Sequence, residues 1–273
     1  QYRHPCYHHT SNDDHQATTH HPTSTQDHPA HQEPRPHQSC PQLLQTVFRC
    51  CCRRATPSRY TSYNWLECPR EVKEYAEQYL SGTLIDIGCG TQPYQDLVSP
   101  YINEHIGVDH KGSQHDLSKA NLIGTAYEIP AEDNSFESAL CTAVLEHLEE
   151  PELAIKECYR VLKPGGIAVY SVPFIWHLHE EPRDFYRFSK YGLKYLFEKT
   201  GFTILELKPL SGFWVTFGQL FVYNLYRLNK GPLRWLGIIH LIGLFTQATA
   251  FILDKFDKTE QWTWMYMVVA RKP

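Results

Sequence analysis

From about residue 60 onward, the chain carries apolar residues at two different spacings that alternate along its length. Short apolar runs predict buried strands, whereas apolar residues spaced three and four apart predict amphipathic helices. The strand-length runs lie at 84–87, 105–109, 138–142, 167–173, 203–207 and 261–270. The helical spacings lie at 69–80, 151–162 and 189–200. Because helices alternate with strands, the pattern predicts a mainly parallel sheet with helices on its faces.

The first strand-length run contains Asp86 and breaks into Gly88-Cys89-Gly90. Glycine lets the backbone turn sharply and approach a ligand closely. Pro93 stands where a following helix would begin, so the amides at that helix N-terminus would face the ligand. A dinucleotide fingerprint needs a third glycine three residues after Gly90, and Pro93 occupies that position, which weakens a pyrophosphate site. We therefore expect another kind of nucleotide site at this turn.

Asp86 followed by Gly88-Cys89-Gly90 resembles motif I of the class I S-adenosylmethionine-dependent methyltransferases, and the string 160–166 resembles their type 11 members. The resemblance covers roughly residues 60–210 and resumes at 260–272. It implies a doubly wound, Rossmann-like α/β fold with a seven-stranded sheet, the last strand antiparallel. It also implies S-adenosylmethionine as the cofactor and methyl transfer as the activity.

Asp109 ends the second predicted strand and is placed to accept hydrogen bonds from both ribose hydroxyls of a nucleoside. A helix N-cap is the alternative role for this aspartate. The resemblance implies that Thr125, with Asp116 as the alternative, contacts the adenine. It places Gln92, Thr125 and Glu137 where many members carry glycine, an acid and aspartate. The predicted cofactor-binding residues are Asp86, Gly88, Cys89, Gly90, Asp109, Thr125, Ala126, Thr142 and Ala143.

The segment 174–188 follows the predicted strand 167–173 and concentrates His, Glu, Asp, Arg and aromatic residues. Loops at this edge of an α/β sheet commonly build the binding pocket. Its arginines could pair with phosphate or carboxylate on an acceptor, or else form an ion network that only holds the loop shut. The predicted catalytic residues are His147, His179 and Glu180, and the predicted substrate-binding residues are Trp176, Arg183, Tyr186 and Arg187.

Two of these predictions have alternatives. An imidazole such as His147 is a suitable general base near neutral pH, but the resemblance favours a helix-packing or structural role for a histidine there. His177 and His179 lack a third ligand at a recognisable spacing, so we predict no metal site.

The predicted reaction is transfer of the sulfonium methyl to an oxygen or nitrogen of a small-molecule, saccharide or lipid-linked acceptor. Alignment supplies much of the rate, and a base is needed only where the acceptor must lose a proton. Two other classes remain open: a non-catalytic protein that keeps the fold, and an NAD-type Rossmann oxidoreductase.

Composition excludes one class of partner. The net charge of −4 and the sequence pI near 6.5 provide no basic field for nucleic acid. Three of the nine cysteines fall inside predicted elements rather than at the loop spacings of a disulfide framework, which favours a reducing compartment. We therefore expect a cytoplasmic protein, with membrane association as an open question.

The chain divides into a tail and a domain. Residues 1–57 hold nine of the sixteen histidines together with many prolines, and predict a disordered His/Pro-rich tail. The methyltransferase domain is expected over 58–273. Within the tail, Cys50-Cys51-Cys52 between arginines resembles a palmitoylation cluster beside an anionic membrane, although metal scavenging or chance would explain it as well.

An apolar helical insertion is expected over 211–258, before the last strand. Its two long segments, 213–229 and 233–253, carry aromatic and basic residues typical of membrane interfaces. We expect either peripheral membrane contact through 213–253 or packing of these helices against the core or a second copy. The pattern does not fix an oligomeric state.

Overall fold

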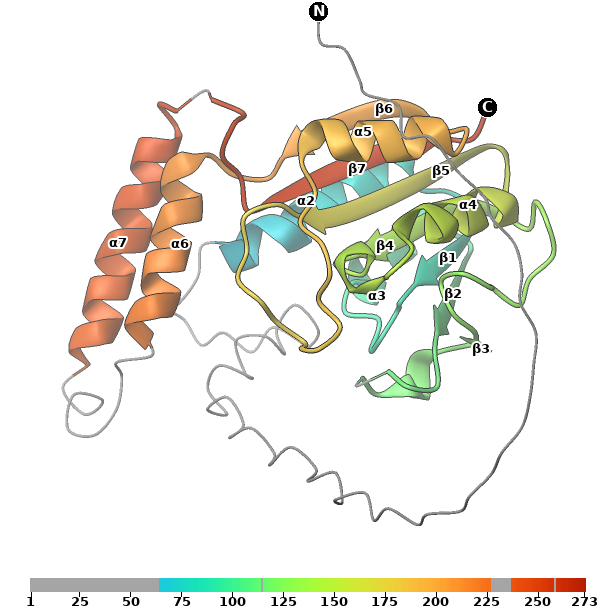
Figure 1. The fold of residues 1–273 in the computed structure, drawn as a ribbon, viewed down its shortest axis with the longest axis horizontal. Coiled ribbons are helices and arrows are strands. Elements are labelled where there is room, and N and C mark those ends of the chain that lie inside the picture. The colour runs from blue at the N-terminus through green and yellow to red at the C-terminus, as the bar shows by residue number, and fades with distance from the viewer. Residues whose placement is uncertain (1–63, 114, 227–236, 258) are drawn as a thin grey trace, which may run out of the picture. The chain divides into compact units, whose positions relative to one another are not determined.

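The computed structural model describes residues 64–113, 115–226, 237–257 and 259–273, and the side chains from Pro69 onward. The predicted tail and the Cys50–Cys52 cluster lie outside these residues. Within them the chain forms a seven-stranded sheet flanked by helices (Figure 1).

The sheet has the strand order β3-β2-β1-β4-β5-β7-β6. β7 pairs antiparallel with both β5 and β6, and the other pairs are parallel. The fold class predicted from the sequence is therefore confirmed. The strands are β1 Thr83–Ile87, β2 Glu104–Asp109, β3 Leu122–Ile123, β4 Phe136–Thr142, β5 Leu162–Pro173, β6 Thr203–Pro209 and β7 Met265–Arg271.

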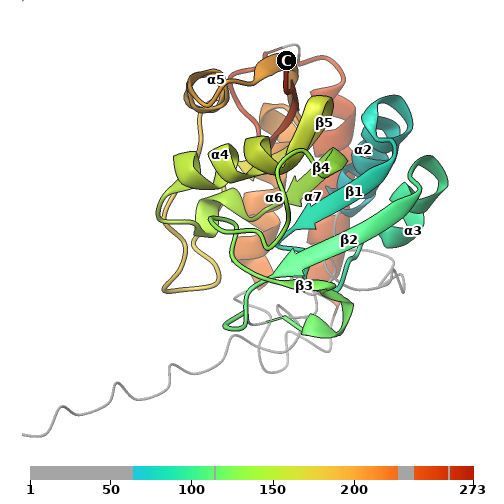
Figure 2. The same ribbon diagram turned by 90° about the vertical axis from the view of Figure 1, so that its right-hand side faces the viewer.

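Helices cover both faces of this sheet. Figure 2 shows α4 and α5 on one side and α2 and α3 on the other. The helices are α2 Asn64–Tyr79, α3 Gln95–Val98, α4 Pro151–Val161, α5 Lys190–Lys199, α6 Phe213–Tyr226 and α7 Ile238–Asp254. Short 3-10 turns lie at Ser99–Tyr101, Leu117–Lys119 and Leu145–His147.

Each face has its own apolar core, and β7 contributes alternate residues to the two. Tyr266 and Val268 pack with the α4 and α5 side, whereas Met267 and Val269 pack with the α2 and α3 side. Because both faces of this strand are buried, its sequence is continuously apolar rather than alternating. This pattern is the reason the strand could be predicted.

Several element boundaries differ from the prediction, and β5 starts at Leu162 rather than at residue 167. The helix expected to start at Pro93 starts at Gln95 and has only four residues, because consecutive turns occupy 89–95. No long helix therefore directs its N-terminus at the glycine turn. α2 starts at Asn64 with Pro69 inside it, and the closing strand starts at Met265 rather than residue 261.

The two predicted apolar helices, α6 and α7, lie side by side as a hairpin (Figure 1). Gly218 allows close approach, because a Cβ there would lie 2.9 Å from the Ala250 Cβ. The Gln247 side chain donates a 2.7 Å hydrogen bond to Gln219 in the buried seam. Among the described helices, none is long and apolar enough to cross a membrane.

Candidate functional site

The glycine turn after β1 is tied directly to the end of β2. Gly88 and Gly90 take positive φ angles of 70° and 48°, which glycine adopts without strain. The Gly88 and Cys89 amides donate to the Val108 carbonyl at 2.9 and 3.2 Å. The Gly90 amide donates to Oδ2 of Asp109 at 3.0 Å. The predicted ribose-binding carboxylate therefore lies beside the turn.

The glycine turn is closely packed against its neighbours. Gln92 itself takes a positive φ of 51°, at a cost of roughly 1 kcal/mol for a residue with a Cβ. A Cβ at Gly88 would lie 2.5 Å from Cγ2 of Val144, and one at Gly107 would lie 2.6 Å from Sγ of Cys89. Neighbouring side chains therefore leave no room for a Cβ at Gly88 or Gly107.

Asp86 contacts a neighbouring strand inside the sheet. Its Oδ2 lies 3.0 Å from Nε2 of His105 on the neighbouring strand, and both side chains are buried. Burial raises the pKa of the Asp86 carboxyl, and the His105 contact opposes that shift. A role of Asp86 at the cofactor stays a prediction.

The predicted adenine-side residues lie in turns. The Thr125 hydroxyl accepts hydrogen bonds from the Tyr127 and Glu128 amides at 3.3 and 3.1 Å, so it stabilises its own turn. Ala126 is half-buried in that turn. Asp116, the alternative, accepts from the Ser118 amide at 2.9 Å as the cap of a 3-10 turn. Both adenine contacts stay predictions.

The end of β4 carries the next two predicted residues to the sheet edge. Thr142 is the last residue of the strand and pairs with Ser171 of β5. Ala143 follows with a positive φ of 52°, and its amide donates to the Ser171 carbonyl at 2.9 Å. A strained backbone of this kind at a strand end is common at functional sites.

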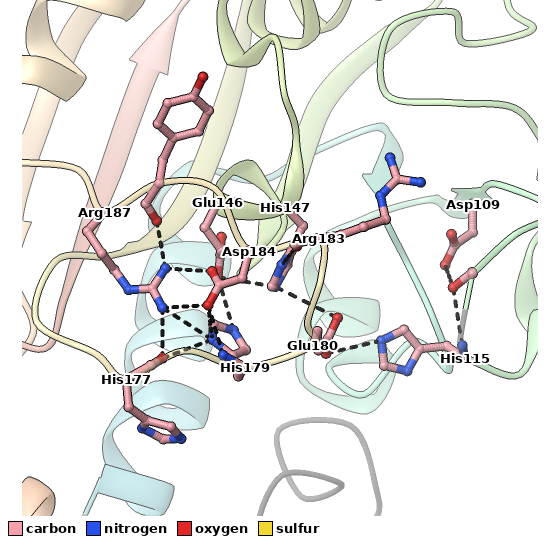
Figure 3. A network of polar contacts seen from close by, with 12 residues as sticks. Asp109, His115, Glu146, His147, His177, His179, Glu180, Arg183, Asp184 and Arg187 are labelled. Atoms are coloured by element: carbon pink, nitrogen blue, oxygen red, sulfur yellow. Dashed lines mark hydrogen bonds and ion pairs between the residues drawn. The ribbon is translucent and has the colours of Figure 1, made fainter. Parts of the chain in front are cut away.

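The predicted catalytic residues come together just beyond β4 (Figure 3). The His147 and His179 rings lie 4.7 Å apart between centroids, edge to face. Nε2 of each ring is 3.8 Å from Oε1 of Glu146, and Nε2 of His147 is also 3.8 Å from Oε2 of Glu180. Two loops far apart in the sequence therefore share one polar cluster.

Burial sets the protonation states in this cluster. Glu146 is only 1% exposed, and this burial raises its pKa to about 8. Burial also lowers the pKa of His179, to which the nearby His147 contributes. The His179 ring is therefore neutral near pH 7.

Glu180 connects this cluster to the glycine turn. It takes a positive φ of 53°, and its Oε1 lies 3.8 Å from Nε2 of His115. The His115 amide donates to Oγ of Ser113 at 3.2 Å, and that hydroxyl lies 3.4 Å from Oδ2 of Asp109. Figure 3 shows this polar path from His147 across Glu180 to Asp109.

Arg187 makes its hydrogen bonds to other residues of the loop 174–188. Its guanidinium binds both carboxylate oxygens of Asp184, at 2.6 and 2.8 Å, and also donates to the Trp176, His177 and Tyr186 carbonyls. The pKa of Asp184 is lowered to about 2, because these hydrogen bonds outweigh the opposing effect of burial. The geometry agrees with the alternative that the ion pair holds the loop in shape, and phosphate binding by Arg187 stays a prediction.

The other predicted substrate-binding residues divide into two groups. Arg183 and Tyr186 both reach Glu149, through its carboxylate at 3.3 Å and its carbonyl at 3.0 Å. Trp176 packs edge to face against Tyr223 of α6, with ring centroids 5.2 Å apart. This last contact joins the acceptor loop to the apolar hairpin.

Three residues of the site were not predicted: Glu146, Asp184 and His115. Glu146 directly precedes the predicted His147, and a carboxylate four residues after the end of a buried strand was the available signal. Asp184 lies in the predicted loop, three residues before the arginine that it binds. His115 offered no signal, because only the fold brings its loop over Gly90.

Comparison with known proteins agrees with this fold. The profile of the type 11 methyltransferase family, described as a methyltransferase domain, matches residues 85–170. The crystal structure of the cyclase SpnF superposes with a TM-score of 0.54 at 21% identity, over 85% of this chain and 92% of that chain. At this identity the similarity concerns the fold alone.

Two curated relatives match shorter stretches. The ubiquinone biosynthesis O-methyltransferase of Alkalilimnicola ehrlichii is 24% identical over 140 residues, which are 46% of this chain and 54% of that protein. The 2-methyl-6-phytyl-1,4-hydroquinone methyltransferase 1 of Oryza sativa is 27% identical over 176 residues, which are 55% of this chain and 51% of that protein. This chain thus spans about half the length of these relatives.

Proposed function

We propose that this chain, whose residues 85–170 match the type 11 methyltransferase domain, is a class I S-adenosylmethionine-dependent methyltransferase that methylates a hydroxyl oxygen of a small lipid-linked acceptor such as a quinol. The observation that carries the proposal is the contact between the acceptor loop and the apolar hairpin, Trp176 against Tyr223. The names of the two curated relatives, which concern ubiquinone and a phytylated hydroquinone, support the same acceptor class.

The residues at the glycine turn fit the family's cofactor. Gly88 and Gly90 present backbone without side chains, and the Asp109 carboxylate beside them suits the two hydroxyls of a ribose. When bound, S-adenosylmethionine supplies a methyl group whose bond to sulfur breaks, with its electron pair left on sulfur, as the acceptor oxygen attacks. Asp109 and the glycine turn would hold the nucleoside, and Thr142 and Ala143 would face the methionine end.

The polar cluster would take the acceptor's hydroxyl proton. Nδ1 of His147 lies 2.6 Å from the Arg183 carbonyl, which can only accept, so Nδ1 carries the hydrogen. Nε2 of His147 is then the basic nitrogen and faces Glu180, whose side chain is 37% exposed. A proton taken at Nε2 can leave through the Glu180 carboxylate to water.

The hairpin gives a lipid-linked acceptor a surface to approach. α6 and α7 carry no charged residue except Asp254 at the very end, although both have solvent-exposed faces. A helix face that meets water normally carries charged side chains, and a large exposed apolar patch marks an interaction site. The large apolar residues exposed on or beside the hairpin include Trp214, Phe217, Phe221, Leu241, Leu244, Phe245, Ile252 and Phe256.

This patch suits a lipid-linked acceptor better than an acceptor that is wholly water-soluble. An apolar hollow of about 390 Å³ lies at the hairpin base, lined by aromatic residues that include Phe213, Trp214 and Trp262. A prenyl chain resting on this surface would place its head group toward Trp176 and the acceptor loop. The hairpin would then contact the membrane from one side, as an interfacial element.

The proposal is tested with methyl-labelled S-adenosylmethionine and a panel of acceptors. The panel holds a prenylated hydroquinone in phospholipid vesicles, an unprenylated catechol, a primary amine and a saccharide mixture. We expect label in the prenylated quinol, release of S-adenosylhomocysteine, and a lower rate without vesicles. Label confined to the saccharide or amine fraction would overturn the acceptor class while leaving methyl transfer intact.

The two alternative functions, a non-catalytic protein and an oxidoreductase, predict different binding and product results. SpnF is named a cyclase although it shares this fold, so the fold by itself does not guarantee methyl transfer. A non-catalytic protein would bind S-adenosylhomocysteine or no nucleoside at all, without forming any methylated product. An oxidoreductase would bind NADH in preference to S-adenosylhomocysteine.

A further inference from the structure

Glu146, His147 and His179 bring three potential metal-ligating atoms to one point beyond β4 (Figure 3). Oε1 of Glu146 lies 3.8 Å from Nε2 of each imidazole, and the ligand atoms of all three residues lie within 4.8 Å of one another. These separations are too long for direct hydrogen bonds. A shared ion between the three groups would account for their convergence.

Groups outside the cluster orient both imidazoles. The Arg183 carbonyl holds the hydrogen on Nδ1 of His147 at 2.6 Å, and Oδ2 of Asp184 lies 3.3 Å from Nδ1 of His179. Each contact turns the Nε2 lone pair toward Glu146. Metal-binding histidines characteristically have such a carbonyl or carboxylate behind the opposite ring nitrogen.

The buried Glu146 carboxylate is a second indication of a bound ion. Its side chain is 1% exposed, and its Oε2 has no hydrogen-bond partner among the described residues. A buried carboxylate is normally paired, hydrogen-bonded or bound to a metal. The Nε2 atoms of His147 and His179 lie 3.8 Å from its Oε1, so neither imidazole gives that oxygen a hydrogen bond.

We infer that Glu146, His147 and His179 form a binding site for a divalent transition-metal ion of the zinc type. Two imidazoles and one carboxylate suit zinc, whereas magnesium prefers oxygen ligands alone. Tetrahedral zinc requires ligand atoms about 3.3 Å apart, so modest side-chain rotation would close the present 3.8 Å separations.

Three protein ligands would leave the fourth coordination position of a tetrahedral zinc ion open, as in catalytic rather than structural zinc sites. Glu180 lies beside the three ligands, with Oε2 3.8 Å from Nε2 of His147, and is partly exposed. Water or the oxygen of an acceptor would bind there. With the ion present, His147 and His179 are ligands, so the proton route through Nε2 of His147 described under the proposed function applies only to the metal-free protein.

The sequence alone predicts no metal site. His177 and His179 are two residues apart and had no third ligand, but only His179 enters the cluster. The turn Leu145–His147 contributes the other two groups. The inference concerns metal binding itself and does not rest on the proposed methyl transfer.

The test uses the 273-residue chain, whose nine histidines in residues 1–57 will also take up zinc. The informative quantity is therefore the difference in bound zinc between the wild-type protein and Glu146→Gln or His179→Gln, measured by mass spectrometry after gel filtration with a weak chelator. Glu149→Gln and His110→Gln are the matched controls, because each removes the same kind of group outside the cluster.

We expect the wild-type protein and both controls to retain one more equivalent of zinc than Glu146→Gln and His179→Gln. Zinc, but not magnesium, should raise the melting temperature of the wild-type protein. Oxidation by bound Fe²⁺ with ascorbate and peroxide should modify His147 and His179, a readout that needs no variant to fold. Equal zinc in wild type and Glu146→Gln, or oxidation confined to the tail, would overturn the inference.

Binding of S-adenosylhomocysteine to the metal-free protein is measured separately. Retention of that binding alongside a failed zinc test would reject the metal site only. Loss of nucleoside binding alongside a successful zinc test would reject the proposed methyl transfer only.

Discussion

Replacing Gly88 with alanine tests whether the turn after β1 has the backbone shape and packing required of a cofactor turn. Gly88 has a φ of 70°, and an added Cβ would lie 2.5 Å from Cγ2 and 3.0 Å from Cγ1 of Val144. Valine is stiff at χ1 and has no flexible end that could move aside. The substitution must therefore shift the turn itself or the strand end that carries Val144.

The structure provides a control that separates the two costs. Gly165 has a φ of 82°, but a Cβ there would meet nothing within 4 Å. Gly165→Ala thus carries only the left-handed backbone cost, about 1–2 kcal/mol, whereas Gly88→Ala adds overpacking of about 1–3 kcal/mol. Both variants lose the same unfolded-state freedom, so the difference between them isolates the clash.

The assay is urea unfolding of both single variants, of Val144→Ala and of the Gly88→Ala/Val144→Ala double variant. We expect Gly88→Ala to be about 1–3 kcal/mol less stable than Gly165→Ala, and the double variant to recover most of that difference. Nucleoside binding should weaken in Gly88→Ala and not in Gly165→Ala. Equal stabilities of Gly88→Ala and Gly165→Ala would refute the close packing described for this turn.

Further predictions concern the carboxylate, the hairpin and the thiols. Asp109→Asn should weaken S-adenosylhomocysteine binding by about 10- to 100-fold, the scale of a lost charge-assisted hydrogen bond, as measured by calorimetry. Phe245→Glu, at a residue 73% exposed, should reduce co-sedimentation with anionic vesicles, whereas Tyr195→Glu, 62% exposed on α5, should not; equal effects would remove the hairpin from the interface. Burial raises the pKa of Cys158 from 9.0 to about 12, so iodoacetamide should leave it unmodified at pH 8 to 10 in the folded protein and alkylate it only after urea unfolding. Arg187→Gln should leave Asp184 buried without its partner and lower the melting temperature of the protein, which scanning calorimetry would show.

The sheet could be predicted from the sequence because its signals are local. Strand runs such as 84–87 and the continuously apolar β7 reflect burial on both faces, and periodicity reports that burial directly. The start of α3 could not be predicted, since Pro93 is compatible with either a helix start or the successive turns seen at 89–95.

The candidate site was only partly predictable for a different reason. Asp109 ends β2 and His147 lies in the turn that follows β4, and the topology alone brings both to one edge of the sheet. The contacts of Glu146 with His179, and of Glu180 with His115, join segments that no spacing rule connects. Only the three-dimensional path of the loop 174–188 sets these distances.

Calorimetric titration of the 273-residue chain with S-adenosylhomocysteine, alongside NADH, asks most directly whether the glycine turn and Asp109 bind an adenosyl cofactor of the methyltransferase type. We expect one molecule of S-adenosylhomocysteine to bind per chain and NADH to give no saturable heat. Saturable binding of NADH alone, or of neither compound, would contradict the assignment.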